Sequence, residues 1–493
     1  MNKKTLLRCA AWLLAVCAVI PMAVACGDDS ENKPLQTTAN KVESDTIDEN
    51  DPYADRLAIS DDLGEYDFGE YKFRIVCTDE GTLYVQDEEG ADVVDTAIFR
   101  RNRKIEERFN CEISVVLDAA GGDDVIGFIN KQVTTGEDAF DLASAHVIAL
   151  GGLVPSNLFL NWYDIPNVNF DKPWWSDSNK DVLTHHDVCL LAVGDLALSA
   201  LYSTYCIFYN KTIGSAYDMP DMFEIVNNGQ WTIDKIVELS KDIYVDLDMD
   251  GTVDPDADLF GYMTHNGSSL NAYLWSFDNP IFENINGSLE LTFKTEKLSS
   301  IFEKLVDTFK NYYGISMASF DEAFAPDVFG EGRLMFANAA IGDALDYRDM
   351  DDDYSILPDP KWDEAQENYY TMVDGSHHAM AVPRTIRDYE AVGTIVEALC
   401  AESYKTVFPA YYDVALKVKG TRDEESIKML DSIVASRVFD FGLVFDNWKG
   451  FASLTTARIS RYDKNIESAY KRYERSSTKW YNTVLEAFEN YEG

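Results

Sequence analysis

Three aspartates alternate along a short acidic loop, Asp246, Asp248 and Asp250, and Gly251 follows them directly. This spacing corresponds to positions 1, 3, 5 and 6 of the calcium-binding loop of EF-hands, in which oxygen ligands surround the ion and a glycine makes the turn. Carboxylates placed this close repel one another unless a cation lies between them. We therefore predict a structural Ca²⁺ site whose ligands are Asp246, Asp248, Asp250, Thr252 and Asp254.

The last position of the loop departs from the EF-hand pattern. Ala257 stands where a bidentate glutamate normally completes the coordination sphere. Asp256 or Asp258 would have to take its place, and the loop geometry would then have to shift. The alternative is an acidic surface turn that binds no ion. No catalytic group is recognisable near the loop, so a bound ion would be structural.

The chain contains none of the motifs GxSxG, HExxH, GxGxxG or GxxxxGK[ST]. Its six histidines include the adjacent pairs His185-His186 and His377-His378. Neither pair has ligand-like neighbours at metal-binding spacing, and adjacent residues on regular structure rarely face the same way. The 86 acidic residues make pairs of carboxylates inevitable, so such a pair does not indicate a glycosidase. We expect a protein that is not an enzyme.

The elements that must position the polar residues begin with a repeated strand-helix pattern. Apolar strands are predicted at 71–77, 112–117 and 140–145, and amphipathic helices at 92–109 and 123–134. Short connections between them favour right-handed crossovers between parallel strands, and hence an α/β lobe.

The rest of the chain indicates that it crosses between two lobes more than once. Helical patterns dominate from residue 200 to 326, short strands return up to residue 384, and the C-terminal part is helical again. A globular part of this length also favours two lobes. We assign residues 66–197 and 328–385 to a first, α/β lobe, and residues 198–327 and 386–493 to a second, helix-rich lobe. The expected crossing segments are 194–203, 326–328 and 384–387.

Several phrases of the sequence occur together in an order that points to one family. Residues 201–262 combine an apolar strand ending in YNK, the helix start WTID, the acidic loop and the tripeptide FGY. The segments DTAIFRRN at 95–102, FGEGRLMF at 329–336 and ILPDPK at 356–361 look like a helix, the start of a strand and a turn of the same family. The chain resembles the extracellular solute-binding proteins of ABC importers, of the large carbohydrate-binding, family 1-like type.

The resemblance implies an α/β, periplasmic-binding-protein-like fold of type II, the Venus flytrap, with a ligand cleft between two lobes. It also implies docking on the permease subunits of the importer. Sugars present apolar faces and hydroxyl edges, so their sites need aromatic rings and polar side chains. The candidate ligand-binding residues are Trp174, Trp175, Tyr202, Ser203, Asn266, Ser269, Asn271, Asp343, Tyr347, Arg348, Asp374, Ser376, His377 and Trp448.

Ordinary packing is the alternative for each of these candidates. Trp231 is assigned to packing, because it precedes Thr232, the expected N-cap of a helix.

The N-terminus indicates export and lipid anchoring. A basic start precedes an apolar stretch too short to span a bilayer, and AVAC resembles a lipobox with alanine in place of the usual leucine. We predict a lipoprotein signal peptide at residues 1–25 and a lipid on Cys26; the alternative is an ordinary secretory signal. Residues 26–65 are acidic and poor in aromatic residues, so we predict a disordered tether between the membrane and the globular part.

The strong negative charge limits the partners. A formal net charge of −44 repels nucleic acid and anionic lipid headgroups and disfavours polyanionic ligands. We therefore expect no nucleic-acid partner. The family resemblance implies a carbohydrate ligand and a permease partner, and we expect a monomer attached by its lipid to the extracytoplasmic face of the cell membrane. The alternatives are a surface glycan-binding or adhesion lipoprotein without a transport role, and a binding protein for a peptide or another polar solute.

Five cysteines remain in the expected mature chain besides the lipid site. Their number is odd, no CxxC spacing occurs and each lies in an apolar context, so buried free thiols are the simpler interpretation. One disulfide is the alternative. The residues are Cys77, Cys111, Cys189, Cys206 and Cys400.

Overall fold

The computed structural model describes residues 51, 53–78, 81–90, 92–119, 124–319, 323–415 and 424–492. All of them belong to one compact unit that spans residues 47–493. The predicted signal peptide, the predicted lipid site Cys26 and the predicted tether up to residue 50 lie outside the described residues. In the part of the chain that is described, no helix is both long enough and apolar enough to cross a membrane.

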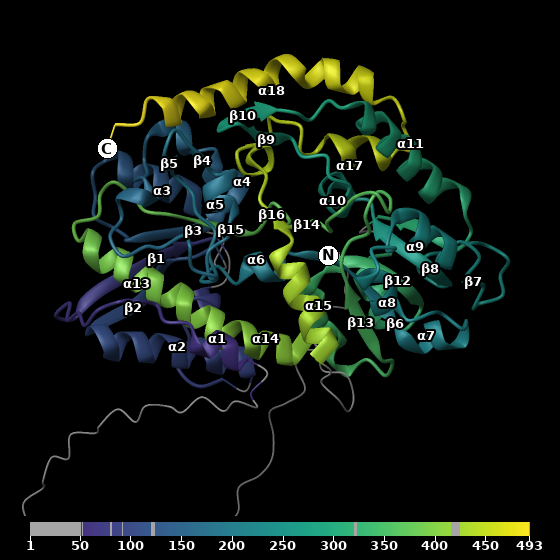
Figure 1. The fold of residues 1–493 in the computed structure, drawn as a ribbon, viewed down its shortest axis with the longest axis horizontal. Helices are drawn as coiled ribbons and strands as arrows, with labels where there is room; N and C mark the ends of the chain where they lie inside the picture. The colour runs from purple at the N-terminus through teal and green to yellow at the C-terminus, as the bar shows by residue number, and fades with distance from the viewer. Residues whose placement is uncertain are drawn as a thin grey trace, which may run out of the picture. The chain divides into compact units, whose positions relative to one another are not determined.

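The first lobe is built on a four-stranded sheet in the order β15-β3-β1-β2 (Figure 1). β1, β2 and β3 are parallel, and β15 runs antiparallel to β3. Because α2 and α3 each connect two parallel strands, they are the crossover helices that the sequence predicts. The bounds are β1 (Tyr71–Cys77), α2 (Val93–Phe109), β2 (Cys111–Leu117), α3 (Val125–Thr134), β3 (Leu142–His146), α4 (Val147–Gly151), α5 (Ser178–Asp181), β4 (Thr184–His185), β5 (Val188–Cys189), β15 (His378–Ala381) and α13 (Tyr389–Glu402).

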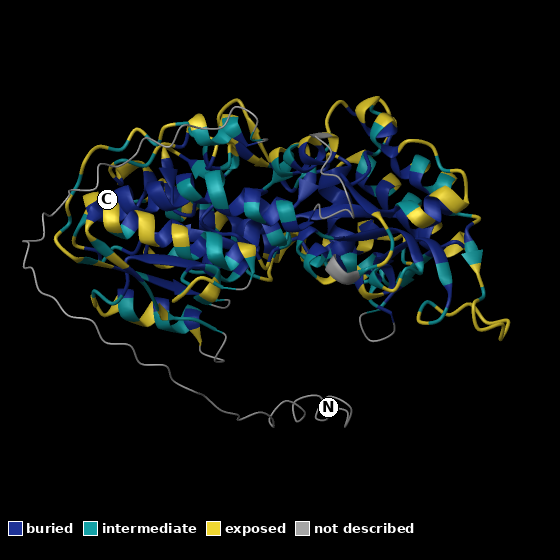
Figure 2. Cartoon of the chain, turned by 90° about the horizontal axis from the view of Figure 1, so that it is seen from below, coloured by how far each residue is buried: buried dark blue, intermediate teal, exposed yellow. Residues whose placement is uncertain are grey.

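The second lobe is built on a sheet in the order β11-β8-β12-β6-β13, with β7 paired to β8. β8, β11 and β12 are parallel, whereas β6 runs antiparallel to β12 and β13. Figure 2 shows buried residues throughout the interior of both lobes. The bounds are β6 (Tyr205–Asn210), α7 (Lys211–Ala216), α8 (Met222–Asn227), α9 (Ile233–Ser240), β7 (Tyr244–Val245), β8 (Leu259–His265), α10 (Ser269–Ser276), β9 (Phe282–Ile285), β10 (Ser288–Leu291), α11 (Glu296–Asn311), β11 (Ile315–Ala318), α12 (Ala325–Gly330), β12 (Leu334–Ala340), η5 (Ile341–Asp349) and β13 (Tyr354–Leu357).

Local capping explains where two of these helices begin. The Asp92 carboxylate accepts a hydrogen bond from the Val94 amide at the start of α2. At the start of α9, Thr232 Oγ1 accepts from the Lys235 amide at 3.2 Å, which confirms the predicted N-cap. Trp231 is fully buried and its indole donates to the Pro358 carbonyl at 2.8 Å, so its predicted packing role is confirmed as well.

The chain divides between the lobes differently from the prediction. β12 and β13 lie in the second sheet, so residues 334–357 belong to the second lobe and not to the first. α13 packs on α2 and β1, so residues 389–402 belong to the first lobe and not to the second. The periodicity of a segment indicates whether it forms a strand or a helix, but not which sheet it joins.

The chain passes from the first lobe to the second at α6 (Ser199–Tyr202), within the predicted segment 194–203. It returns between β13 and β15, where the Asp374 amide donates to the Ser203 carbonyl at 2.8 Å. The predicted crossings at 326–328 and 384–387 are corrected. The former lies within α12, which packs on β12, and the latter joins β15 to α13 in the first lobe.

Two C-terminal helices contact both lobes. α14 packs on α2 in the first lobe and on η5 in the second. α18 packs on β4 in the first lobe and on α11 and α17 in the second, and Figure 1 shows it running along one side of both. The remaining bounds are η3 (Val154–Ser156), β14 (Thr371–Met372), η6 (Ser403–Val407), α14 (Phe408–Ala415), α15 (Glu424–Ala435), β16 (Arg437–Val438), α16 (Phe441–Val444), α17 (Leu454–Ile459) and α18 (Ile466–Glu489).

Residues 53–65, predicted as part of a disordered tether, are ordered against the body of the protein. α1 (Ala54–Ala58) places Arg56 beside Asp431, with its guanidinium 4.4 Å from the centroid of the Tyr404 ring. Two of the acidic residues that suggested disorder, Asp61 and Asp62, have basic partners from distant segments, which composition alone does not reveal. These ion pairs are Asp61–Arg108 and Asp62–Lys172.

The five cysteines of the described region are free, and all except Cys111 are buried.

Candidate functional site

The C-terminal ends of the parallel strands are the edges at which α/β sheets bind ligands. In the first sheet, β3 ends at His146 and β15 begins beside it at His378. In the second sheet, β12 ends at Ala340 and β6 begins opposite it at Tyr205. Both edges lie next to segments at which the chain crosses between the lobes, so residues from both sheets can contribute to one site.

One hydrogen-bonded link joins the two edges directly. The Tyr205 hydroxyl lies 2.8 Å from Ser268 Oγ and donates to Asp374 Oδ2 at 3.3 Å. Ser268 follows β8 in the second lobe, whereas Asp374 precedes β15 of the first lobe. Tyr205 is buried, and Asp374 retains partial solvent access. A carboxylate therefore stands where both lobes supply polar groups.

On the first-lobe side, the polar groups lie at the ends of β1, β3 and β15. Thr78 Oγ1 accepts from the His146 amide at 2.8 Å and lies 3.0 Å from His378 Nε2. The rings of His146 and Trp448 lie with their centroids 5.8 Å apart. We refer to the following residues as the sheet-edge cluster: Thr78, His146, Tyr205, Ser268, Asp374, His377, His378 and Trp448.

Trp448 is the exposed aromatic residue of this cluster. Its side chain is 66% exposed, and every other tryptophan in the described part of the chain is buried or partly buried. A positive φ of 58° places it in a turn that follows α16. An indole has a large apolar face together with one polar N–H, so it suits a ligand that combines apolar faces with hydroxyl groups.

The charge state of the cluster disfavours an anionic ligand. Burial acts to raise the pKa of Asp374, but hydrogen bonds from Ser268 and Ser376 outweigh it and hold the pKa below its usual range. Burial lowers the pKa of His377 to about 3 and that of the neighbouring His265 to about 4. At neutral pH these imidazoles are uncharged, and Asp374 is an ionised hydrogen-bond acceptor.

His377 also has a defined hydrogen-bonding pattern. Its Nδ1 lies 2.6 Å from the Asp374 carbonyl oxygen, so Nδ1 carries the proton and donates it there. Nε2 is then an acceptor, and it has no hydrogen-bond partner among the described residues. The ring is fully buried, so a hydroxyl donor that reached Nε2 would satisfy an otherwise unpaired group.

The structure brings some of the predicted ligand residues together. Asp374, His377 and Trp448 belong to the sheet-edge cluster, and Ser376 is exposed in the same loop as Asp374. Tyr202 and Ser203 lie at the first crossing, as predicted, and the Tyr202 ring contacts the Tyr411 ring at a centroid distance of 4.8 Å. Asn266 lies just after β8, where its amide donates to the Ala318 carbonyl.

The predicted platform at Trp174 and Trp175 is corrected, because both rings lie in the core of the first lobe. Their exposed fractions are 0% and 4%. Their indole N–H groups donate to the two carboxylate oxygens of Glu397, at 2.9 and 2.8 Å. Burial raises the pKa of Glu397 to about 7, although the indole hydrogen bonds act to lower it. The tandem tryptophans therefore share one buried acceptor.

Four further candidates have structural partners. Ser269 is fully buried and its hydroxyl donates to the His265 carbonyl, and Asn271 Oδ1 accepts from Thr456. Asp343 caps η5 by accepting from the Ala340 amide at 2.9 Å. Each of these side chains therefore has a hydrogen-bond partner within the protein, and its ligand-binding role stays a prediction. Tyr347 likewise packs in an aromatic group with Phe208, Phe329 and Tyr354. The side chain of Arg348 lies outside the described part of the structure.

Five residues of the sheet-edge cluster were not among the predicted ligand residues: Thr78, His146, Tyr205, Ser268 and His378. Tyr205 lies just after a predicted crossing, and Thr78 directly follows a predicted strand, so position at a strand end was an available signal. Ser268 lies between two residues that were selected only for their polarity, Asn266 and Ser269.

The acidic loop has part of the geometry that a Ca²⁺ site requires. Carboxylate oxygens of Asp246, Asp248 and Asp250 lie within 4.8 Å of one another, and Gly251 has the positive φ of 79° that the turn needs. The amide of Asp250 lowers the pKa of Asp248, but partial desolvation and the neighbouring carboxylates outweigh it and raise that pKa. The Asp258 carboxylate accepts hydrogen bonds from the Tyr244 hydroxyl and from the backbone amides of Leu247 and Asp254. It is therefore not free to replace the missing glutamate as a ligand of the ion.

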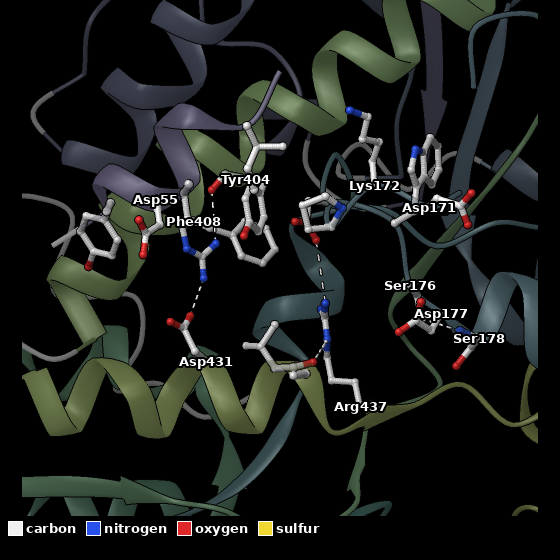
Figure 3. Close-up of a pocket in the computed structure, with 18 residues that line it drawn as sticks. Asp55, Asp171, Lys172, Ser176, Asp177, Ser178, Tyr404, Phe408, Asp431 and Arg437 are labelled. Carbon is white, nitrogen blue, oxygen red and sulfur yellow. Dashed lines mark hydrogen bonds and ion pairs between the residues drawn. The ribbon is translucent and has the colours of Figure 1, made fainter. Parts of the chain in front are cut away.

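A cavity of about 690 Å³ lies elsewhere, between α1, the loop that contains Trp175, and α15. Arg56 forms an ion pair with Asp431. Figure 3 shows Asp431 and Arg437 among the residues that line the cavity. Arg437 Nη2 lies 3.8 Å from Asp195 Oδ1. Since both guanidiniums already face carboxylates, neither presents an unbalanced positive charge to a ligand. We refer to this space as the Arg437 cavity.

Comparisons with known proteins show a likeness in fold. No protein-family model matches the chain, and no curated protein matches its sequence. Among solved structures, the chain is similar to the maltose-maltodextrin binding protein of Alicyclobacillus acidocaldarius, with a TM-score of 0.50 and 13% sequence identity. The match covers 84% of this chain and 99% of the other. The chain therefore has the predicted α/β, two-lobed, periplasmic-binding-protein-like fold.

Proposed function

We propose that this protein is a lipid-anchored solute-binding protein that captures a sugar or oligosaccharide outside the cell and delivers it to an ABC permease. The observation that carries the proposal is the sheet-edge cluster, in which both sheets supply polar groups beside the exposed indole of Trp448. The fold in which this cluster lies is similar to that of a maltose-maltodextrin binding protein. The family resemblance of the sequence supports the export signal, the lipid on Cys26 and the permease partner.

The chemistry of the cluster supports a neutral, hydroxyl-rich ligand. Asp374 accepts hydrogen bonds as a carboxylate, and Trp448 offers a flat apolar face. Because the groups come from both lobes, a ligand that contacts all of them favours the arrangement in which the lobes are close together. That arrangement would then be the form that a permease recognises.

The test is a thermal-shift screen of the chain from residue 27 onward against monosaccharides, oligosaccharides and short peptides. A ligand at about 100 times its Kd stabilises the folded state by about 2.7 kcal/mol and raises the melting temperature. We expect a shift with one class of sugar. A shift with peptides alone would keep the binding role and replace the substrate class. If no sugar or peptide raised the melting temperature of the folded protein, the non-transport alternative would gain support.

The acidic loop is proposed to hold a structural Ca²⁺ ion through Asp246, Asp248, Asp250, the Thr252 carbonyl and Asp254, with water completing the coordination sphere. We expect 1 mM Ca²⁺ (roughly the affinity range of extracellular sites) to raise the melting temperature, because the ion relieves repulsion among the carboxylates. The double variant Asp246→Asn/Asp250→Asn should lose this response.

The matched control is Asp242→Asn, an exposed acid just outside the loop, which should respond to Ca²⁺ like the natural protein. Equal melting temperatures of the natural protein with Ca²⁺ and with a chelator would remove the ion from the proposal.

A further inference from the structure

His185, His186 and Glu489 converge at one point on the surface of the first lobe. A potential ligand atom of each lies within 4.8 Å of those of the other two. The imidazole centroids lie 4.3 Å apart, and His185 Nε2 lies 4.0 Å from Glu489 Oε1. The histidines come from the β4–β5 hairpin and the glutamate is the last residue of α18, whose C-terminal part lies beside that hairpin in Figure 1.

This convergence corrects the expectation that adjacent histidines face different ways. That expectation holds for regular strands, in which successive side chains point to opposite faces. His186 and Asp187 form the turn of the hairpin and have positive φ angles of 50° and 59°. The left-handed backbone breaks the alternation, so both rings lie on the side that α18 approaches.

We propose that His185, His186 and Glu489 form a binding site for a divalent transition-metal ion of the Zn²⁺ class. Two imidazole nitrogens and one carboxylate oxygen are a donor set that Zn²⁺ uses, with water in the fourth position. The harder ions Ca²⁺ and Mg²⁺ prefer oxygen ligands, so these donors also discriminate against them.

The distances require only a small adjustment to fit an ion. Tetrahedral bonds of about 2.0–2.1 Å place neighbouring donor atoms about 3.4 Å apart, whereas His185 Nε2 and Glu489 Oε1 are 4.0 Å apart. The Glu489 side chain is 51% exposed and has room to move. Burial and the neighbouring His186 lower the pKa of His185, which favours the neutral form that binds metal.

Packing alone explains only one of the three residues. His185 is buried, and its ring contacts the Phe488 ring at a centroid distance of 6.3 Å. His186 and Glu489 are exposed, so packing gives no reason for their approach. A bound ion would fasten the C-terminal end of α18 to the first lobe, and the same helix packs on α11 and α17 of the second.

The test is titration of the metal-free mature chain with Zn²⁺. Calorimetry measures the binding of the ion, and a thermal-shift assay measures the melting temperature. We expect one Zn²⁺ per chain and a higher melting temperature. His186→Ala and Glu489→Gln should each weaken Zn²⁺ binding at least about tenfold, since each removes one of three protein ligands. Substitution with Co²⁺ should give the visible absorption of a tetrahedral site in the natural protein.

The control is Glu486→Gln, an exposed residue one turn earlier on α18, which should bind Zn²⁺ like the natural protein. The proposal is overturned if the natural protein binds no Zn²⁺, or if His186→Ala and Glu489→Gln bind it as tightly as the natural protein. Tight binding in all variants would assign the ion to another group of side chains. Because these residues are exposed, the variants are expected to fold, and circular dichroism verifies this.

Discussion

Replacing Trp448 with alanine is expected to weaken sugar binding about 30-fold, which corresponds to ~2 kcal/mol, the scale of one aromatic hot spot. The indole is 66% exposed and lies against His146 at the edge of the first sheet. Removing an exposed ring creates no cavity in the core, so the melting temperature without ligand should change little. Isothermal titration calorimetry with the sugar found in the screen measures the change in Kd.

Two further variants locate the site. Tyr313→Ala removes a ring of similar exposure, 76%, that is not part of the sheet-edge cluster, and it should leave the Kd unchanged. Ala435→Trp introduces a bulky side chain on α15 at the wall of the Arg437 cavity, and it should also bind sugar normally. If Ala435→Trp abolished binding while Trp448→Ala retained it, the ligand would lie in the Arg437 cavity and not at the sheet edges.

The local structure of the first lobe could be predicted from the sequence because short-range patterns determine it. Strand β1 occupies the predicted residues, and the α2 face of Val94, Ile98, Ile105 and Phe109 is buried as its periodicity indicates. The Thr232 cap likewise depends on a hydrogen bond between near neighbours. In each case the interacting groups lie a few residues apart.

The division into lobes and the pairing of distant side chains could not be predicted in this way. Trp174 and Trp175 have the composition of a stacking platform, but Glu397, more than two hundred residues later, supplies an acceptor for both. A polar partner at that separation allows two indoles to be fully buried, and no local pattern reveals it. The same holds for Tyr205, whose partners Ser268 and Asp374 come from two later segments.

Lowering the pH from 7.5 to 5 is expected to stabilise this protein, because buried carboxyl groups have raised pKa values. Burial raises the pKa of Asp195, Asp359 and Glu397 to about 7, and that of Asp440 and Asp446 to about 6. The folded state therefore holds protons that the unfolded state releases above pH ~4. Stability is lost as the pH rises through this window and gained as it falls.

We expect a melting temperature about 5 °C or more higher at pH 5 than at pH 7.5, measured by calorimetry. Below pH ~4 the gain ends, because the unfolded state also binds these protons and paired carboxylates such as Asp61 lose their charge. A melting temperature that fell steadily from pH 7.5 to 5 would contradict the assignment.

The variant Asp359→Asn measures how much one buried carboxylate contributes to the pH dependence of the whole protein's stability. The Asp359 side chain is 1% exposed, Oδ1 accepts from Asn338 Nδ2 at 2.9 Å, and Oδ2 has no hydrogen-bond partner among the described residues. Asparagine retains the Oδ1 acceptor and carries no charge, so the free energy of unfolding of the variant should rise by about 1–3 kcal/mol at pH 7.5 and little at pH 5.

Glu303→Gln, which removes an exposed acid from α11, should leave the pH dependence unchanged. Equal destabilisation of Asp359→Asn at both pH values would mean that its hydrogen bond, and not its charge, determines the stability at this position.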